Sequence, residues 1–272
     1  MCCIKVSFRE SICYILSDDE DFIAKIKVML RGFKIVSCGC FEANDAEKII
    51  NVKRIMHQKY ECSCGDMVND FSEKKALGFV IRYVLEIIGR ETPNCLFLHG
   101  GCIEYKGETY CFLGKTKSGK STLTHYFCEN IDCKYLTDDL ICLNEKNECI
   151  PFLKPIFLRE NKYIGRKTES IVIEYQDDVR YCLVPRCLVD LSENYKIDNI
   201  VILERNLGEN PKLYKLSGAE AFMSIWGNMH NSDNMAKKRR VSIELAKSAN
   251  VYHLQYNEIS IDFDDILKLF NK

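Results

Sequence analysis

The chain has 272 residues, of which 47% are hydrophobic and 28% are charged, a composition typical of globular proteins. A chain of this length forms one large domain or two small ones, and either can bury a sizeable core. The formal net charge of −1 argues against a nucleic-acid or membrane-surface partner. No apolar run reaches the roughly 18 residues of a membrane span, and the start lacks the layout of a secretory signal. We therefore expect a cytoplasmic protein with no nucleic-acid partner and no membrane partner.

Sixteen cysteines are many for a chain of this length. A disulfide framework is disfavoured because thiols stay reduced in the cytosol. Cys38–Cys40 and Cys62–Cys64 are two close pairs, but metal sites usually combine wider spacing with further ligands. We expect most of the cysteines to pack as small buried apolar residues, and a zinc or iron–sulfur site is the alternative.

Residues 1–92 have the pattern of a separate, smaller α+β domain. Short apolar runs predict strands, and apolar residues at helical spacing predict two helices. The stretch 41–70 is polar and ambiguous. No chemistry is visible here, so we expect a docking or dimerisation domain, which leaves a homo-oligomer open. The expected elements are strands at 4–8, 12–16 and 34–38 and helices at 17–33 and 73–88.

Residues 93–272 alternate strand and helix patterns, which indicates an α/β domain. A two-residue turn at Lys106-Gly107 predicts a β-hairpin. The basic run Lys237–Arg240 falls within a helical pattern, so we interpret it as a solvated helix face rather than a nucleic-acid patch. The expected strands are 96–98, 102–105, 108–113, 134–137, 141–143, 171–173, 181–184, 200–204 and 251–255, and the expected helices are 122–129, 221–229, 234–249 and 263–270.

One stretch of this second domain fits the phosphate-loop pattern of glycine, four residues and Gly-Lys-Ser. It stands between a predicted strand and a predicted helix, which is the context that the motif needs. Its glycines let backbone N–H groups turn inward, and the helix N-terminus favours phosphate. The predicted nucleotide-binding residues are Gly114, Lys115, Thr116, Lys117, Ser118, Gly119, Lys120, Ser121 and Thr122.

Within this loop, Lys120 can reach the β- and γ-phosphates, and the Ser121 hydroxyl can ligate Mg²⁺. Asp138 and Asp139 end a predicted strand some 20 residues further on. One carboxylate there can hold the metal together with Ser121, and the other can accept a proton from an attacking hydroxyl. The predicted metal ligands are therefore Ser121, Asp138 and Asp139. The alternative interpretation, without a catalytic role, is that the pair forms an Asx turn at the surface.

His99 precedes the hairpin that carries the loop, so it can lie near the γ-phosphate. It could orient a nucleophile or carry charge, although a lone histidine is often only a hydrogen-bonded structural residue. The candidate catalytic residues are thus His99, Lys120, Asp138 and Asp139. An arginine often assists phosphoryl transfer, and the sequence does not choose among its candidates, which are Arg159, Arg166, Arg180 and Arg186.

The order Leu98-His-Gly-Gly, hairpin, phosphate loop, and Leu136-Thr-Asp-Asp resembles the catalytic domain of HPr kinase/phosphorylase. It is more similar to the shorter HPr-kinase-related serine kinases found beside peptide-modification enzymes. The resemblance covers roughly residues 95–205. It implies a P-loop kinase core related to phosphoenolpyruvate carboxykinase, the cofactors ATP and Mg²⁺, and transfer of phosphate to a serine of a peptide or small protein. By matching position, His99 would stand near the reacting phosphate.

Three alternatives to a serine kinase remain. The glycine- and arginine-rich signature of the bifunctional enzymes is missing after the Asp pair, which argues against a kinase/phosphorylase. A GTPase switch would need Asn-Lys-x-Asp and Asp-x-x-Gly segments, and neither is found. The third is a non-catalytic nucleotide-binding partner of a peptide-modification system.

Overall fold

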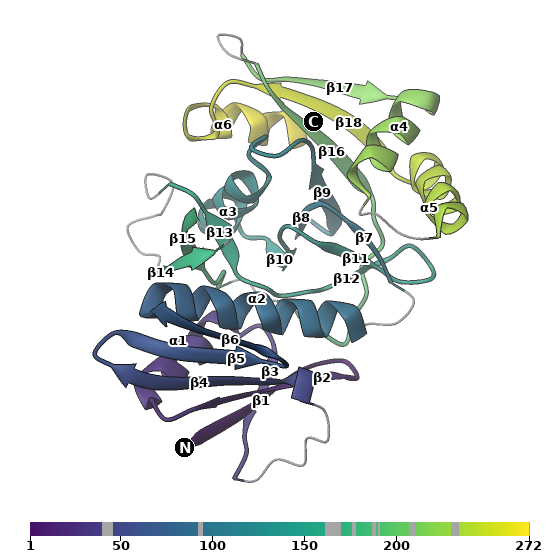
Figure 1. The fold of residues 1–272 in the computed structure, drawn as a ribbon. Coiled ribbons are helices and arrows are strands. Elements are labelled where there is room, and N and C mark those ends of the chain that lie inside the picture. Colours follow the sequence, from purple (N-terminus) through teal and green to yellow (C-terminus); the bar gives the residue numbers. More distant parts are fainter. Residues whose placement is uncertain are drawn as a thin grey trace. The chain divides into compact units, whose positions relative to one another are not determined.

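The computed structural model describes the whole chain except residues 40–45, 92–94, 161–169, 176–177, 187–188, 190, 207–209, 230–233 and 272. The chain forms two compact units, each built from two stretches of sequence (Figure 1). The first contains Met1–Pro93 and Phe157–Val184, and the second contains Asn94–Ile156 and Pro185–Lys272. The described residues form several sheets and six α-helices, which confirms the mixed α/β class.

Six strands form the larger sheet of the first unit: β1 (Cys2–Phe8), β2 (Ser11–Ser17), β3 (Lys34–Ser37), β4 (Ile49–Met56), β5 (Lys59–Cys64) and β6 (Met67–Ser72). Their order is β3-β1-β2-β4-β5-β6, and only β2 and β4 pair in parallel. Alternate residues of β1, such as Ile4 and Val6, are buried, as expected for a sheet with one covered face. A 3₁₀ turn (Ala46–Lys48) precedes β4.

Two helices pack in the first unit. Helix α1 (Glu20–Met29) begins after Asp19, whose carboxylate accepts a hydrogen bond from the Phe22 N–H at 3.0 Å. Helix α2 (Glu73–Glu91) carries a wide apolar stripe and packs both on the larger sheet and on β14. The smaller sheet has the order β13-β15-β14 and consists of β13 (Ile156–Leu158), β14 (Ser170–Tyr175) and β15 (Asp178–Leu183).

The central sheet of the second unit has the order β10-β8-β9-β16-β18-β17. Strands β9, β16 and β18 are parallel to one another, while β8 and β9 form the predicted hairpin. The strands are β8 (Gly100–Tyr105), β9 (Glu108–Leu113), β10 (Lys134–Thr137), β16 (Asn199–Arg205), β17 (Lys212–Leu216) and β18 (Asn250–Tyr256). A second sheet, of order β12-β11-β7, consists of β7 (Leu96–Leu98), β11 (Ile141–Leu143) and β12 (Cys149–Ile150).

Helices cover both faces of the central sheet, which explains why β9 and β16 are continuous apolar runs. Cys111 and Leu113 of β9 pack with α4 and α5, whereas Tyr110 and Phe112 face α3 and α6. Successive strand residues therefore join two different cores. The helices are α3 (Lys120–Asn130), α4 (Gly218–Asn228), α5 (Met235–Ser248) and α6 (Ile259–Phe270).

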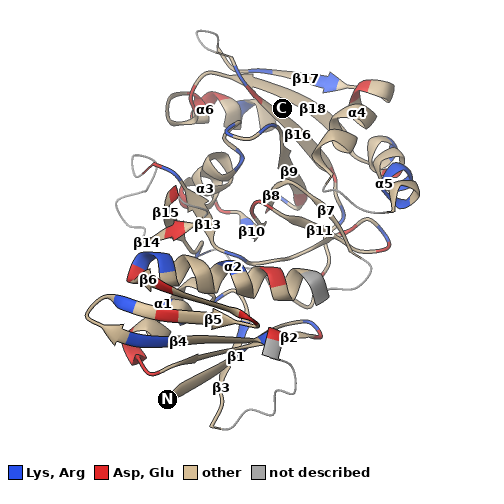
Figure 2. Ribbon diagram, in the orientation of Figure 1, with Lys and Arg blue, Asp and Glu red and all other residues tan. Residues whose placement is uncertain are grey.

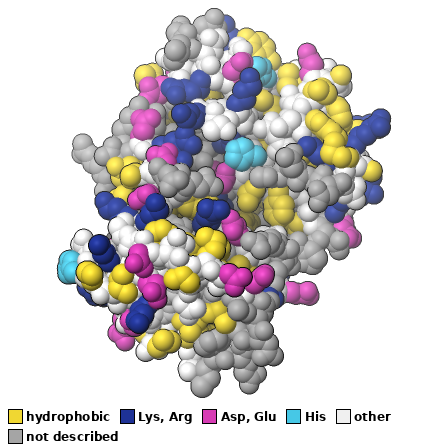
Figure 3. Space-filling view, in the orientation of Figure 1, with side chains coloured by type: hydrophobic (Ala, Val, Ile, Leu, Met, Phe, Trp, Pro, Cys, Tyr) yellow, Lys and Arg dark blue, Asp and Glu magenta, His cyan; other side chains and the backbone are white. Residues whose placement is uncertain are grey.

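The basic run Lys237–Arg240 lies on α5, as expected (Figure 2). Lys238 departs from a solvated face, because it is buried and its ammonium group stands 4.7 Å from the centre of the Trp226 ring. Acidic, basic and apolar side chains are interspersed over the surface shown in Figure 3, in keeping with the small net charge. Among the helices in the described part of the chain, none is both long and apolar enough to cross a membrane.

One segment differs from the predicted domains. Sequence analysis places residues 157–184 in the C-terminal domain, but in the structure they belong to the first unit. The reason is local packing, because β14 lies against α2 at Gly78. The roles predicted for the two domains stay predictions.

Gly78 provides a test of this packing. A Cβ atom built at Gly78 would lie well inside 3.0 Å of the Glu174 carbonyl oxygen, so Gly78→Ala must displace β14. We expect a loss of about 1–3 kcal/mol in the free energy of unfolding of the first unit, measured by urea denaturation. Gly89→Ala in the same helix is the control, because a Cβ there has no described atom within 4 Å. The control should be neutral or stabilise by up to about 1 kcal/mol. Equal effects of the two substitutions would contradict the packing account.

Candidate active site

The phosphate-loop segment follows β9 directly and leads into α3, the predicted strand–loop–helix arrangement. Gly114 and Gly119 have φ values of +142° and +93°, which glycine adopts without strain. A Cβ at Gly114 would lie 2.7 Å from the Leu203 carbonyl oxygen, and one at Gly119 would collide with the Tyr256 hydroxyl. Tyr256 also donates a hydrogen bond to the Ser118 carbonyl oxygen. The turn therefore needs glycine at both positions, and Tyr256 supports it from β18.

Lys120 opens α3 and is buried within the loop. Its ammonium group donates hydrogen bonds to the carbonyl oxygens of Gly114 at 2.9 Å and Lys115 at 3.0 Å. Burial lowers the pKa of Lys120, and the negative charges of Asp138 and Asp139 oppose this shift. The cation is thus held inside the turn of the loop, facing the same region as the aspartate pair.

The remaining loop residues differ in exposure. Lys115, Thr116 and Lys117 are exposed, whereas Ser121 and Thr122 are half-buried in the first turn of α3. Ser118 is buried, and its hydroxyl oxygen has no hydrogen-bond partner among the described residues. An unsatisfied hydroxyl beside an uncapped helix N-terminus leaves donors that an anion would satisfy.

Asp138 follows β10 and is 1% exposed. The Ser121 side chain lies near its carboxyl group, and the Oδ1 atom of Asp138 has no hydrogen-bond partner in the described part of the chain. Burial raises the pKa of Asp138 to about 6, and Asp139 adds to this effect, while Lys154 and Ser121 oppose it. A buried carboxylate with an unsatisfied oxygen is costly unless a cation or donor compensates it.

Asp139 points elsewhere because its backbone is left-handed, with a φ of +69°. Its Oδ1 atom lies 3.2 Å from His99 Nδ1, and its Oδ2 atom lies 2.9 Å from the ammonium nitrogen of Lys154. The Lys154 ammonium holds the pKa of Asp139 well below its usual range, His99 contributes, and burial opposes the shift. The pKa values of the two aspartates are therefore shifted in opposite directions, and the two side chains face different partners.

His99 stands between β7 and β8. Its backbone N–H donates to the Asn228 carbonyl oxygen at 2.8 Å, and its Nδ1 atom is also 3.0 Å from the Asp139 carbonyl oxygen. The glycines after it allow a close approach, as expected. A Cβ at Gly101 would collide with the Thr124 hydroxyl and lie 3.1 Å from Asp138 Oδ1. His99 is thereby brought to Asp139, and Lys120, Ser121 and Asp138 lie in the same unit.

Two residues around this site were missed by sequence reasoning. Lys154 is 1% exposed although it is charged, and its signal was a lone lysine in the otherwise apolar stretch 151–157. Asn228 ends α4, and its side-chain oxygen accepts a hydrogen bond from the Gly114 N–H at 3.0 Å. Since its carbonyl oxygen also binds the His99 N–H, Asn228 joins the loop to the histidine. No sequence signal distinguishes it from other asparagines.

Two of the four candidate arginines belong to the other unit of the chain. Arg159 and Arg180 belong to the first unit, where both approach Asp178, at 3.8 and 3.0 Å. Arg186 is exposed in the second unit, and Arg166 lies outside the described residues. Within the second unit, the buried cations near the aspartates are Lys120 and Lys154.

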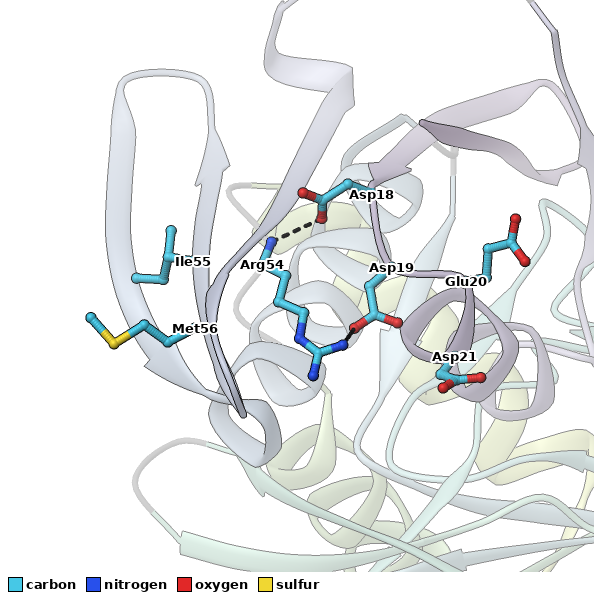
Figure 4. Close-up of a pocket in the computed structure, with 7 residues that line it drawn as sticks. All are labelled: Asp18, Asp19, Glu20, Asp21, Arg54, Ile55 and Met56. Atoms are coloured by element: carbon cyan, nitrogen blue, oxygen red, sulfur yellow. Dashed lines mark hydrogen bonds and ion pairs between the residues drawn. The ribbon is translucent and has the colours of Figure 1, made fainter.

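A cavity of about 560 Å³ lies in the first unit, and no residue of the candidate active site lines it (Figure 4). Two of the four carboxylates that line it already have Arg54 as a partner. Asp18 accepts a hydrogen bond from the Arg54 N–H at 2.9 Å, and Asp19 caps α1 while binding Arg54 and Tyr60. We interpret it as the capped start of α1 and not as a ligand site. Its lining consists of Asp18, Asp19, Glu20, Asp21, Arg54, Ile55 and Met56.

The cysteines behave mainly as packing residues. None of the 14 cysteines in the described residues forms a disulfide bond, and nine of them are buried. Cys62 and Cys64 are both buried on β5, whereas Cys40 lies outside the described residues. Within the described ranges, no group of three or more His, Cys, Asp or Glu side chains could hold a metal ion.

Comparisons with known proteins add little. No family model matches the chain, and no curated protein matches it. Among solved structures, the Hpr(Ser) kinase/phosphatase from Coxiella burnetii aligns with a TM-score of 0.34 and 11% identity, covering 64% of this chain and 94% of that chain.

Asn228 offers a test of how the site is held. Asn228→Ala removes the acceptor of the partly buried Gly114 N–H, which costs about 1–2 kcal/mol. We expect amide hydrogen exchange at Gly114 to accelerate about tenfold. Asn130→Ala is a matched control, since both asparagine side chains donate to the carbonyl four residues earlier on a helix, at 2.8 Å and 2.9 Å. Unchanged exchange at Gly114 in Asn228→Ala would show that this contact does not hold the loop.

Proposed function

We propose that this chain is an ATP-dependent kinase that transfers the γ-phosphate to a hydroxyl group, serine in particular, of a peptide or small protein. One observation carries the proposal. The buried, unsatisfied Oδ1 atom of Asp138 belongs to a carboxyl group that lies near Ser121, at the N-terminus of the helix that follows a glycine-rich loop. A phosphate-binding loop with a carboxylate beside its serine is the arrangement that phosphoryl-transfer sites use.

The loop fits a nucleotide. Residues Gly114–Thr122 would hold the phosphates through backbone N–H groups at the start of α3. Lys120 would exchange its two carbonyl contacts for phosphate oxygens, and this exchange is favourable because an ammonium group binds an anion more strongly than a carbonyl. The unsatisfied Ser118 hydroxyl supplies a further donor.

The residues also fit Mg²⁺. Ser121 and Asp138 would hold it, since Mg²⁺ is usually bound through one or two protein oxygens together with phosphates and water. A bound Mg²⁺ supplies positive charge for the β- and γ-phosphate oxygens. The cation would also offset the cost of burying the Asp138 carboxylate. Asp139 was predicted as a ligand as well, but its two oxygens already face His99 and Lys154.

Asp139 and His99 would orient the acceptor hydroxyl. Phosphoryl transfer is catalysed mainly by positioning and charge, so a carboxylate of low pKa suffices. The bond between the acceptor oxygen and the γ-phosphorus forms as the bond to the β-phosphate oxygen breaks. The hydroxyl proton passes to Asp139, and ADP leaves. The side chain of Asp139 is 43% exposed, which leaves it accessible to a substrate.

The acceptor class and the cellular setting rest on the sequence. The motif order resembles HPr-kinase-related serine kinases, which is the reason for proposing serine on a peptide or small protein. We also propose that the protein acts in the cytoplasm on a peptide or small-protein partner, without nucleic acid or membrane. A docking or dimerisation role for residues 1–92 stays part of this proposal.

The direct test is transfer of radiolabelled phosphate from γ-labelled ATP and Mg²⁺ to a library of serine-containing peptides. We expect Asp138→Asn to lower the rate about 10²- to 10⁴-fold, because the site loses the charge that holds the metal. Asp132→Asn, an exposed aspartate of the same unit, is the control and should leave the rate unchanged. Transfer by the wild type that survives Asp138→Asn would refute the assigned role.

Nucleotide binding can be measured separately by calorimetry. We expect Lys120→Ala to weaken Mg²⁺-ATP binding by at least about tenfold, because a buried cation facing the phosphates is lost. Lys106→Ala, at the far turn of the β8–β9 hairpin, is the control. If ATP binds in a Lys120-dependent way but no peptide or protein is labelled, the chain is a non-catalytic nucleotide-binding partner.

A further inference from the structure

Lys154 is one of the two most deeply buried charged residues of the site, at 1% exposure, and Asp138 is the other. Burial of an ammonium group is costly, and such a group persists in a protein only when it is paired. Its partner is Asp139 Oδ2, at 2.9 Å. No sequence motif includes Lys154, and the proposed kinase mechanism gives it no role.

The backbone around Lys154 is fixed to the core of the second unit. Its carbonyl oxygen accepts a hydrogen bond from the buried Tyr135 hydroxyl at 2.7 Å, and its N–H donates to the Phe152 carbonyl oxygen at 2.7 Å. Phe152 in turn bridges to Thr137, the last residue of β10. The ammonium group therefore approaches Asp139 from a rigid support.

Asp139 connects this cation to His99. With Oδ2 held by Lys154, the Oδ1 atom faces His99 Nδ1 at 3.2 Å. The three side chains form a row that runs from full burial at Lys154 to 36% exposure of the His99 side chain. A carboxylate held at one oxygen presents the other in a defined direction, and a histidine ring takes its orientation from the partner of its Nδ1 atom.

We propose that Lys154 is a positioning residue that fixes Asp139, and through it the His99 ring, for phosphoryl transfer. This inference rests on the proposed kinase function. It also divides the aspartate pair: Asp138 and Ser121 hold the metal, and Asp139 orients His99 and the acceptor hydroxyl. In this proposal, Lys154 supplies the positive charge that was expected from an arginine.

The kinetic test uses Lys154→Met, which keeps most of the length of the side chain and removes its charge. We expect kcat for peptide phosphorylation to fall about 10- to 100-fold, as for other residues that orient a catalytic group, while KM and Kd for Mg²⁺-ATP change less than about threefold. Lys154→Arg should restore part of kcat. In an Asp139→Asn background, Lys154→Met should lower kcat by less than about a further threefold, because the two side chains act as one unit.

Lys134→Met is the matched control, since Lys134 also pairs with a carboxylate, Glu104, in the same unit. It should leave kcat unchanged. A wild-type rate in Lys154→Met, or independent effects of Lys154→Met and Asp139→Asn, would overturn the inference. A change in KM with kcat unchanged would also overturn the inference, because it would indicate a role in binding.

A second readout does not depend on kinase activity. The imidazole ¹⁵N resonances of His99, assigned among the five histidines with His99→Gln, report its ring environment. Lys154→Met and Lys154→Arg should both shift them, and Lys134→Met should not. Unshifted resonances would overturn the positioning role. If the wild type transfers no phosphate but the His99 resonances shift in the Lys154 variants, the kinase function is refuted. The coupling of Lys154, Asp139 and His99 is then still supported.

Discussion

The close approach of β8 to α3 at Gly101 is the constraint on which the site depends. A side chain at this position would collide with the Thr124 hydroxyl and crowd Asp138. Because Gly101 has none, the strand that begins beside His99 can lie directly against the helix that begins with Lys120. The hairpin then returns along β9 into the loop, so the two ends of one hairpin arrive at the same place.

The electrostatics follow from this packing. Two buried lysines and two aspartates stand in one unit, and each lysine has a different function in the charge balance. Lys120 is held by backbone carbonyl groups, which leaves its charge available to an anion. Lys154 pairs with Asp139, whereas the Oδ1 atom of Asp138 has no hydrogen-bond partner among the described residues. The difference between the two aspartates arises from geometry, since a left-handed backbone at Asp139 turns neighbouring side chains apart.

Local signals sufficed for the elements that carry the loop. The glycine pattern, the Lys106-Gly107 turn and the apolar run of β9 together predicted the hairpin, the loop and α3 close to their observed bounds. The sequence of strands β4, β5 and β6 was ambiguous. Strands β4 and β6 are largely exposed, so their apolar alternation is weak, whereas β5 alternates but has cysteines at two of its three buried positions. The hydrogen bonds of Asn228 and the ion pair of Lys154 join residues far apart in sequence, and spacing alone carries no signal for such contacts.

The domain membership of residues 157–184 could not be predicted from local sequence either. Its strands have ordinary sequences, and nothing in them indicates which unit they join. The informative residue is instead Gly78, which lies in the middle of α2, where glycine lowers helix stability by about 1 kcal/mol relative to alanine. A glycine retained at that cost indicates that another backbone approaches closely, and β14 supplies it. Residues that weaken their own element thus mark where distant parts of the chain meet, at Gly78 in α2 as at Gly101 in β8.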